Sequence, residues 1–471
     1  MRMKLSLLAV SLLAIPCAAF AQGKVTSQTD PEIFLAQGTS LDIEVAGQVY
    51  AGAISLPLDD ERTQVNLGQG TNPLDFCVAE GTQRQCLILQ PGEPIDFTIR
   101  HEGRDAVLVL SYLEPQANFP LTYRQAHAGL IDVEIPRAYE MVNVALALTR
   151  ASRAEQGLVA SSPYADKVRT RFAALADHPF IVALDAKLAE DRQSYHLLKM
   201  NGAAFDLADD NSITRSPFYR SIGWGGNTLL PLQDQMQDFA NRANFVQFYA
   251  EHADLYAQQI DFMRNALAAE DMLSWLGSEF PDVAPYDYTR ILFSPLVGDN
   301  QSVARFDDDG FRELQPHVNF PYPSSADSGF SPDAERIWRG LILFTELNHG
   351  FINPTADEFT DEIAAAMPDK SIWASGETAI GYRDGNGIFD EMMNWALVSV
   401  RAQDELPSKQ AALIAERVAR MMVKNRGFIR FVPFQERLLT MAVARRQDVS
   451  IAALYPQIVA MLPEVAALPA D

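Results

Sequence analysis

Residues 331–354 read SPDAERIWRGLILFTELNHGFINP, and this segment decides how the larger part of the chain is interpreted. Ser331 suits the N-cap of a helix, and Pro332 suits its first helical position. The apolar residues that follow recur at helical spacing, which predicts a helix through His349. Gly350 and the pair Asn353 and Pro354 are residue types that commonly end a helix.

The five residues Thr345-Glu346-Leu347-Asn348-His349 carry the chemistry of this helix. Residues four apart share one helix face, so Thr345 and His349 lie on the same side with Glu346 beside them. In the pattern His-Glu-x-x-His, two histidines so placed hold zinc, and the glutamate takes a proton from metal-bound water. Thr345 stands here in the first histidine position, whereas Glu346 and His349 match the pattern.

A short β-meander precedes this helix, and a second helix follows it. Strands are predicted at 290–294, 302–305 and 314–320, and the strand 291–293 is expected in the sheet that packs against the helix. The second helix is predicted from about Asp390 to just before Pro407. Glu391 lies 42 residues after His349 in the sequence. It is either a third metal ligand or a first-turn glutamate that complements the helix dipole. Asn394, three residues on, is expected to support the site together with Asn348.

Four segments resemble a domain-of-unknown-function family of exported bacterial proteins, which is similar to the gluzincin (zincin) metallopeptidases. They are Ile135-Pro136-x-x-Tyr139-Glu140, Phe245-x-x-Phe248-Tyr249, the block from Thr345 to Pro354, and Arg426-Gly427-Phe428. The resemblance covers about residues 133–460. It implies that His349 is a metal ligand, Glu346 the general base, Glu391 a third ligand and zinc the cofactor.

Thr345 departs from that family pattern at a ligand position. Either Glu346 becomes a ligand itself, or a distant histidine such as His317 or His252 completes the site. A third interpretation is that Glu346, Asn348 and His349 form a hydrogen-bonded polar cluster without metal.

Two function classes follow. The first is an exported metal-dependent peptidase-like hydrolase with a degenerate zinc motif. The second is a non-catalytic protein of the same fold that binds a peptide or protein without cleaving it. No phosphate-binding loop, dinucleotide-binding fingerprint or Gly-x-Ser-x-Gly motif occurs in the sequence.

The N-terminal part of the chain has a different pattern. Residues 22–132 are predicted to form a small all-β domain, because apolar and polar residues alternate at 41–45 and 95–99. Cys77 and Cys86 flank a polar turn, which predicts a disulfide-stapled hairpin. Residues 133–471 are predicted to form a larger, mainly helical zincin-like domain with a short β-sheet, so the expected fold class is α+β.

The net charge and the N-terminal residues limit where the protein is expected and which partners it is expected to bind. The formal net charge is −23, which opposes binding to nucleic acid. Residues 1–21 have the basic start, short apolar core and Ala-Phe-Ala end of a signal peptide, so we expect a periplasmic or secreted protein. No later segment is long and apolar enough to predict a membrane span.

Overall fold

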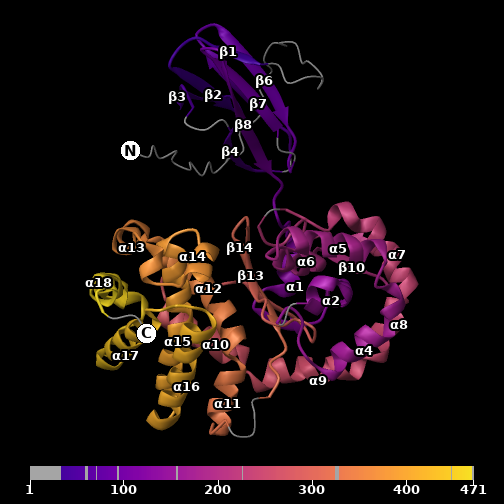
Figure 1. Cartoon of the computed structure of the whole chain (residues 1–471), viewed down its shortest axis with the longest axis vertical. Helices are drawn as coiled ribbons and strands as arrows, with labels where there is room; N and C mark the ends of the chain where they lie inside the picture. The colour runs from indigo at the N-terminus through magenta and orange to yellow at the C-terminus, as the bar shows by residue number, and fades with distance from the viewer. Residues whose placement is uncertain are drawn as a thin grey trace. The chain divides into compact units, whose positions relative to one another are not determined.

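The computed structural model describes residues 33–58, 62–70, 72–92, 95–154, 157–224, 226–323, 328–446 and 448–468. The signal peptide expected at 1–21 lies outside these residues. The chain forms two compact units, Met1–Gln116 and Ala117–Asp471 (Figure 1). The first consists of strands and the second is mainly helical, so the fold class is α+β as predicted. No described helix combines the length and the apolar character that a bilayer crossing requires.

The first unit is a sandwich of two four-stranded sheets. One sheet has the order β1-β7-β8-β4 and the other has the order β3-β2-β5-β6. The strands are β1 (Phe34–Ala36), β2 (Ser40–Val45), β3 (Gln48–Ser55), β4 (Arg62–Gln69), β5 (Leu74–Glu80), β6 (Gln83–Leu89), β7 (Ile95–His101) and β8 (Arg104–Leu113). The two sheets enclose one apolar core, in which the rings of Phe76 on β5 and Phe97 on β7 lie 6.3 Å apart.

The predicted hairpin with its disulfide is confirmed. Cys77 on β5 and Cys86 on β6 are directly opposite each other in the antiparallel register and are disulfide-bonded. The disulfide joins two adjacent strands of one sheet, and Cys77 is buried there.

The boundary between the units lies after Gln116, not near residue 133 as the pattern predicts. Residues 117–132 include helix α1 (Leu121–His127) and the start of strand β9 (Leu130–Glu134). β9 pairs in parallel with β12 (Tyr288–Ser294), which belongs to the second unit. The alternating pattern of a strand indicates that it is a strand, but not which sheet it joins.

The second unit is built around a mixed sheet with the order β13-β14-β12-β9. β13 (Ser302–Asp308) and β14 (Phe311–Asn319) form an antiparallel hairpin, whereas β12 runs parallel to β14 and to β9. Asp309 and Gly310 at the hairpin turn both have positive φ. Two such residues define the tight turn that joins antiparallel strands.

Helices surround this sheet. They are α2 (Arg137–Leu148), α3 (Arg150–Ala154), α4 (Pro163–Arg171), α5 (Pro179–Glu190), α6 (Ser194–Asn201), α7 (Gln233–Ala243), α8 (Phe245–Glu251), α9 (Ala253–Asp261), α10 (Ala269–Glu279), α11 (Pro332–Arg339), α12 (Leu341–Asp357), α13 (Thr360–Ala366), α14 (Gly376–Gly381), α15 (Gly385–Glu405), α16 (Ser408–Arg420), α17 (Phe431–Ala444) and α18 (Tyr455–Ala466). A two-stranded ribbon, β10 (Phe205–Leu207) with β11 (Ile213–Arg215), follows α6.

The two faces of the sheet contact different helices. Strand β14 packs against α12, and the two run side by side in Figure 1. Gly350 on α12 is the point of close approach, since a Cβ there would lie 3.0 Å from Leu314 Cδ1. Side chains alternate along a strand, so Glu313, Gln315 and His317 point to the opposite face. The His317 ring accordingly lies 5.5 Å from that of Tyr139 on α2.

The helix predicted from 331 to 349 is two helices, and it does not end at Gly350. α11 ends before Gly340, and α12 continues through Gly350 and Pro354 to Asp357. Pro354 has no N–H to donate to the Gly350 carbonyl, four residues earlier. The hydroxyl of Tyr286 donates to that carbonyl instead, at 3.0 Å. A tertiary contact therefore satisfies the group that would otherwise end the helix.

Candidate functional site

Two of the three residues predicted to converge, His349 and Glu391, meet at the contact between α12 and α15, and the third, Glu346, lies within electrostatic reach of both. Glu346 and His349 come from α12 and Glu391 from α15, two helices that pack against each other. His349 Nε2 lies 3.8 Å from Glu391 Oε2. The side chains are 20 % and 12 % exposed respectively, so the cluster is largely closed to solvent and reaches it at His349.

Both nitrogens of His349 have hydrogen-bond partners. Nδ1 lies 3.0 Å from Asn353 Oδ1, and Asn394 Nδ2 lies 3.0 Å from Nε2. The amide of Asn394 donates to Nε2, so the ring proton sits on Nδ1 and is donated to Asn353. The two contacts hold the imidazole ring in one orientation between α12 and α15.

The asparagines also join the two helices. Asn348 Nδ2 donates to the backbone carbonyl of Asn394 at 3.1 Å, and both residues are buried. The supporting role expected for Asn348 and Asn394 therefore has a geometric basis. The side-chain oxygens of both, and Oδ1 of Asp390, are buried without a hydrogen-bond partner among the described residues.

Glu391 does not lie in the first turn of its helix. α15 begins at Gly385 with Asp384 as its N-cap, so Glu391 is in the second turn, beyond the reach of the dipole at the helix start. Its partners are specific side chains instead. Arg426 Nη1 lies 2.5 Å from Glu391 Oε1, and Trp395 Nε1 donates to the same oxygen at 2.8 Å.

No role in the site was predicted for Arg426, although it stands in one of the segments that carry the resemblance. Its guanidinium also donates to the Tyr382 hydroxyl at 3.2 Å and lies 4.8 Å from the centre of the Trp395 ring. Burial alone would raise the pKa of Glu391, but Arg426, and after it His349, holds that pKa below its usual value. Glu391 is therefore an ionised carboxylate paired with a permanent cation.

Glu346 has the opposite character. It is 9 % exposed. Burial raises its pKa to about 7; His349 and Lys199 act against this rise, and Glu391 adds to it. A carboxyl group with such a pKa can give or take a proton near neutral pH.

Lys199 on α6 is a second partner that the sequence did not indicate. Its side chain is fully buried, and its ammonium donates to the carbonyls of Asn300 and His317, the latter at 3.1 Å. Burial lowers the pKa of Lys199 to about 7, against the attraction of Glu346. A lysine within the apolar run of a helix was the only signal available in the sequence.

Thr345 does not take the place of the missing imidazole. It is 1 % exposed, and its hydroxyl donates to the carbonyl of Ile342 at 2.9 Å, within its own helix. The hydroxyl proton of Thr345 is therefore used within α12, and a threonine hydroxyl is in any case a poor substitute for an imidazole ligand.

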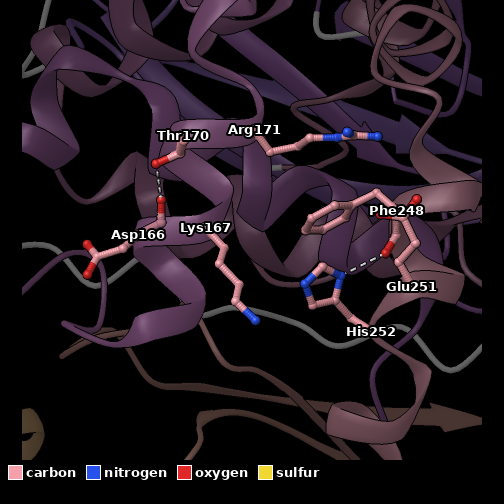
Figure 2. A pocket seen from close by; sticks show the side chains of 7 residues that line it. All are labelled: Asp166, Lys167, Thr170, Arg171, Phe248, Glu251 and His252. Carbon is pink, nitrogen blue, oxygen red and sulfur yellow. Dashed lines mark hydrogen bonds between the residues drawn. The ribbon is translucent and has the colours of Figure 1, made fainter.

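Neither distant histidine completes the cluster. His317 is buried on the opposite face of the sheet, with Nε2 2.9 Å from Gln315 Oε1. His252 lies in an open recess of about 480 Å³ between α4 and α8, and its Nδ1 is 2.9 Å from the Phe248 carbonyl (Figure 2). Its neighbours there are Lys167 and Glu251, which belong to other parts of the fold than α12 and α15.

The donor set of the cluster does not suit zinc. A catalytic zinc needs three protein ligands at about 2.0–2.2 Å in open tetrahedral geometry. His349 Nε2 is occupied by the Asn394 amide, Glu391 is neutralised by Arg426, and the Thr345 hydroxyl is bonded within its own helix. The described residues contain no group of three His, Cys, Asp or Glu side chains arranged to hold a metal ion.

Comparisons with known proteins add no assignment, because no protein-family model, curated protein or solved structure matches the chain.

Proposed function

We propose that the second unit is a non-catalytic relative of zincin metallopeptidases that binds an extended peptide or protein segment without cleaving it. The observation that carries this proposal is the ion pair between Arg426 Nη1 and Glu391 Oε1 at 2.5 Å. The position of a third zinc ligand holds a carboxylate that is bound to a fixed positive charge. A zinc ion placed beside it would be repelled by the guanidinium, which stays protonated at any physiological pH.

An unpaired sheet edge beside the cluster supports peptide binding. Among the described strands, β13 pairs with β14 alone and is therefore an edge strand. Arg305 on β13 donates to the carbonyl of His349 at 3.4 Å, which places this edge next to the cluster. A free strand edge can accept an extended peptide through main-chain hydrogen bonds, while neighbouring side chains select the sequence.

The compartment expected from the sequence agrees with this role. The Cys77–Cys86 disulfide supports an oxidising environment, since such bonds are rare in the cytosol. The proposal therefore keeps the protein periplasmic or secreted, with peptides of that compartment as its ligands.

A peptidase-like hydrolase is the second candidate, and one observation favours it. Glu346 has a pKa of about 7, which is what a general base in hydrolysis requires. In this candidate Glu346 would accept a proton from water, and His349 beside it would stabilise the carboxylate before the transfer.

Metal binding separates the two candidates. The chain is purified without chelator, and its zinc content and zinc affinity are measured by elemental analysis and titration calorimetry. We expect no stoichiometric zinc in the parent and no cleavage of a peptide library that it nevertheless binds. Stoichiometric zinc that disappears in His349→Ala, with loss of peptidase activity, would overturn the proposal.

A gain-of-binding series sharpens this experiment. Thr345→His restores the missing imidazole but leaves Arg426 in place, so it should gain little zinc affinity. Thr345→His combined with Arg426→Met frees Glu391 and should bind zinc at least about tenfold more tightly than the single variant. Equal affinity of both variants would mean that Arg426 does not prevent metal binding.

A further inference from the structure

A recess on the other face of the sheet has the features of a small-molecule site. It has a volume of about 410 Å³ and is formed by residues from α1, β9, β10 and β12. Tyr288, Arg290 and Glu313 share this face, whereas α12 with Glu346 and His349 packs on the opposite one. The recess is therefore separate from the candidate functional site, and its role does not depend on the proposed function.

Aromatic rings form one wall of the recess. The Tyr123 ring lies 4.1 Å from that of His127 and 4.5 Å from that of Phe218, and the Tyr288 ring lies 4.8 Å from His127. Tyr123 is held in place by a hydrogen bond, since its hydroxyl donates to the buried carboxyl of Glu313 at 2.9 Å. The faces of Tyr123 are covered by the stacked rings of Phe119 and His127, so the half-buried Phe218 is the ring of this wall that offers an aromatic surface to a ligand.

The two arginines of the recess are already engaged. Arg290 lies 2.5 Å from Glu134, and its guanidinium stacks 5.2 Å from the Tyr219 ring. Arg264 Nη2 lies 3.8 Å from Asp132 Oδ1, and Asp132 also accepts a hydrogen bond from the Tyr288 hydroxyl at 3.1 Å. Each arginine thus has its own carboxylate.

Asp206 is the third carboxylate of the recess, and neither arginine forms an ion pair with it. It is an exposed residue that lines the recess from β10, and it makes no hydrogen bond or ion pair to a described side chain, although the charge of Arg290 acts on it from a distance. Three carboxylates face two arginines, so the recess carries one uncompensated negative charge beside its aromatic wall. Partial burial raises the pKa of Asp206, with Glu134 adding to the rise and Arg290 opposing it. A cationic ligand would therefore balance the net negative charge of the recess.

We propose that this recess binds a small organic cation that carries one ammonium or guanidinium group on an apolar body. The cationic group would pair with Asp206, and the apolar body would lie against Phe218. Ammonium and guanidinium groups are recognised in proteins by this combination of a carboxylate and aromatic faces. The volume suits a small molecule rather than a protein segment.

The test uses three probes of one shape and different charge with the full chain. They are phenethylammonium, neutral 2-phenylethanol and anionic 3-phenylpropionate, each titrated by calorimetry and by ligand-observed NMR. We expect binding of phenethylammonium alone, weakened by added salt as for an ion pair open to solvent. Preferred binding of 3-phenylpropionate would overturn the proposal and assign the recess to anions held by Arg264.

Variants tie the binding to the recess. Asp206→Asn should weaken phenethylammonium binding by about tenfold or more, because it removes the charge and keeps the shape. Asp254→Asn, an exposed first-turn residue of α9, makes the same charge change elsewhere and should leave binding unchanged. Phe218→Leu should weaken binding without changing the circular dichroism spectrum. Equal loss in both Asp variants would show that the cation is attracted only by the acidic surface as a whole, and would refute the proposal.

Discussion

The ion pair between Arg426 and Glu391 should be a large contributor to the stability of the second unit, and Arg426→Met tests this. The variant leaves the Glu391 carboxylate, 12 % exposed, with the Trp395 indole as its main hydrogen-bond donor. Removing one partner of a buried pair costs about 3–5 kcal/mol, since the other charge stays uncompensated. Partial exposure of Arg426, at 30 %, places the expected loss near the lower end, about 3 kcal/mol at pH 7.5.

The destabilisation caused by Arg426→Met should depend on pH in one direction. In the parent, the pKa of Glu391 lies below its usual value of 4.5, so its stabilisation is complete above that pH and is lost as the pH falls. In Arg426→Met, burial without the cation should raise that pKa above 4.5. The folded state would then bind the proton more tightly than the unfolded chain, and stability would fall as the pH rises. The destabilisation should therefore be smaller at pH 5 than at pH 7.5.

A double-mutant cycle measures the coupling directly. Glu391→Gln and the combination of both changes are unfolded in urea alongside Arg426→Met, with tryptophan fluorescence as the signal, because Trp395 lies under the guanidinium. The double variant should be less destabilised than the sum of the single ones by about 2 kcal/mol or more. Arg420→Met removes the exposed pair with Glu416 and should cost under about 0.5 kcal/mol. Additive single effects would refute the role given to this ion pair.

Three further outcomes are expected. Non-reduced protein should have the mass of an oxidised Cys77–Cys86 pair with no alkylatable thiol, and replacing both residues by serine should lower the stability of the first unit by about 2–3 kcal/mol. Glu346, with its pKa raised to about 7, should make the second unit lose stability as the pH rises from 4.5 to 7, because the folded state binds the extra proton. Glu346→Gln should remove that slope in urea unfolding measured at several pH values, and an unchanged slope would contradict the assignment. Gly350→Ala should cost about 1–3 kcal/mol, since its Cβ would lie 3.0 Å from two side chains, whereas Gly277→Ala on the exposed face of α10 should be neutral or stabilising by chemical denaturation.

Much of the site could be predicted because its residues are local in sequence or carry a strong pattern. The convergence of His349 and Glu391 followed from helical spacing and the order of the elements, and the 3.8 Å separation confirms it. The end of α12 could not be predicted. Gly350 and Pro354 are helix-ending residues by their own chemistry, and the Tyr286 hydroxyl that lets the helix continue comes from a distant segment.

The sequence by itself determined the elements and their local chemistry: the α+β fold class, the disulfide hairpin, the turn at 307–310 and the helix that presents Glu346 and His349. These depend on periodicity, turn residues and spacing, which are properties of residues close together in the sequence. Only the tertiary structure decided the electrostatic character of the site. Arg426 pairs with Glu391, and Lys199 acts on Glu346 through its charge, each from a segment far away in the chain. Burial then makes these charges act strongly on one another, because a protein interior screens them far less than water does.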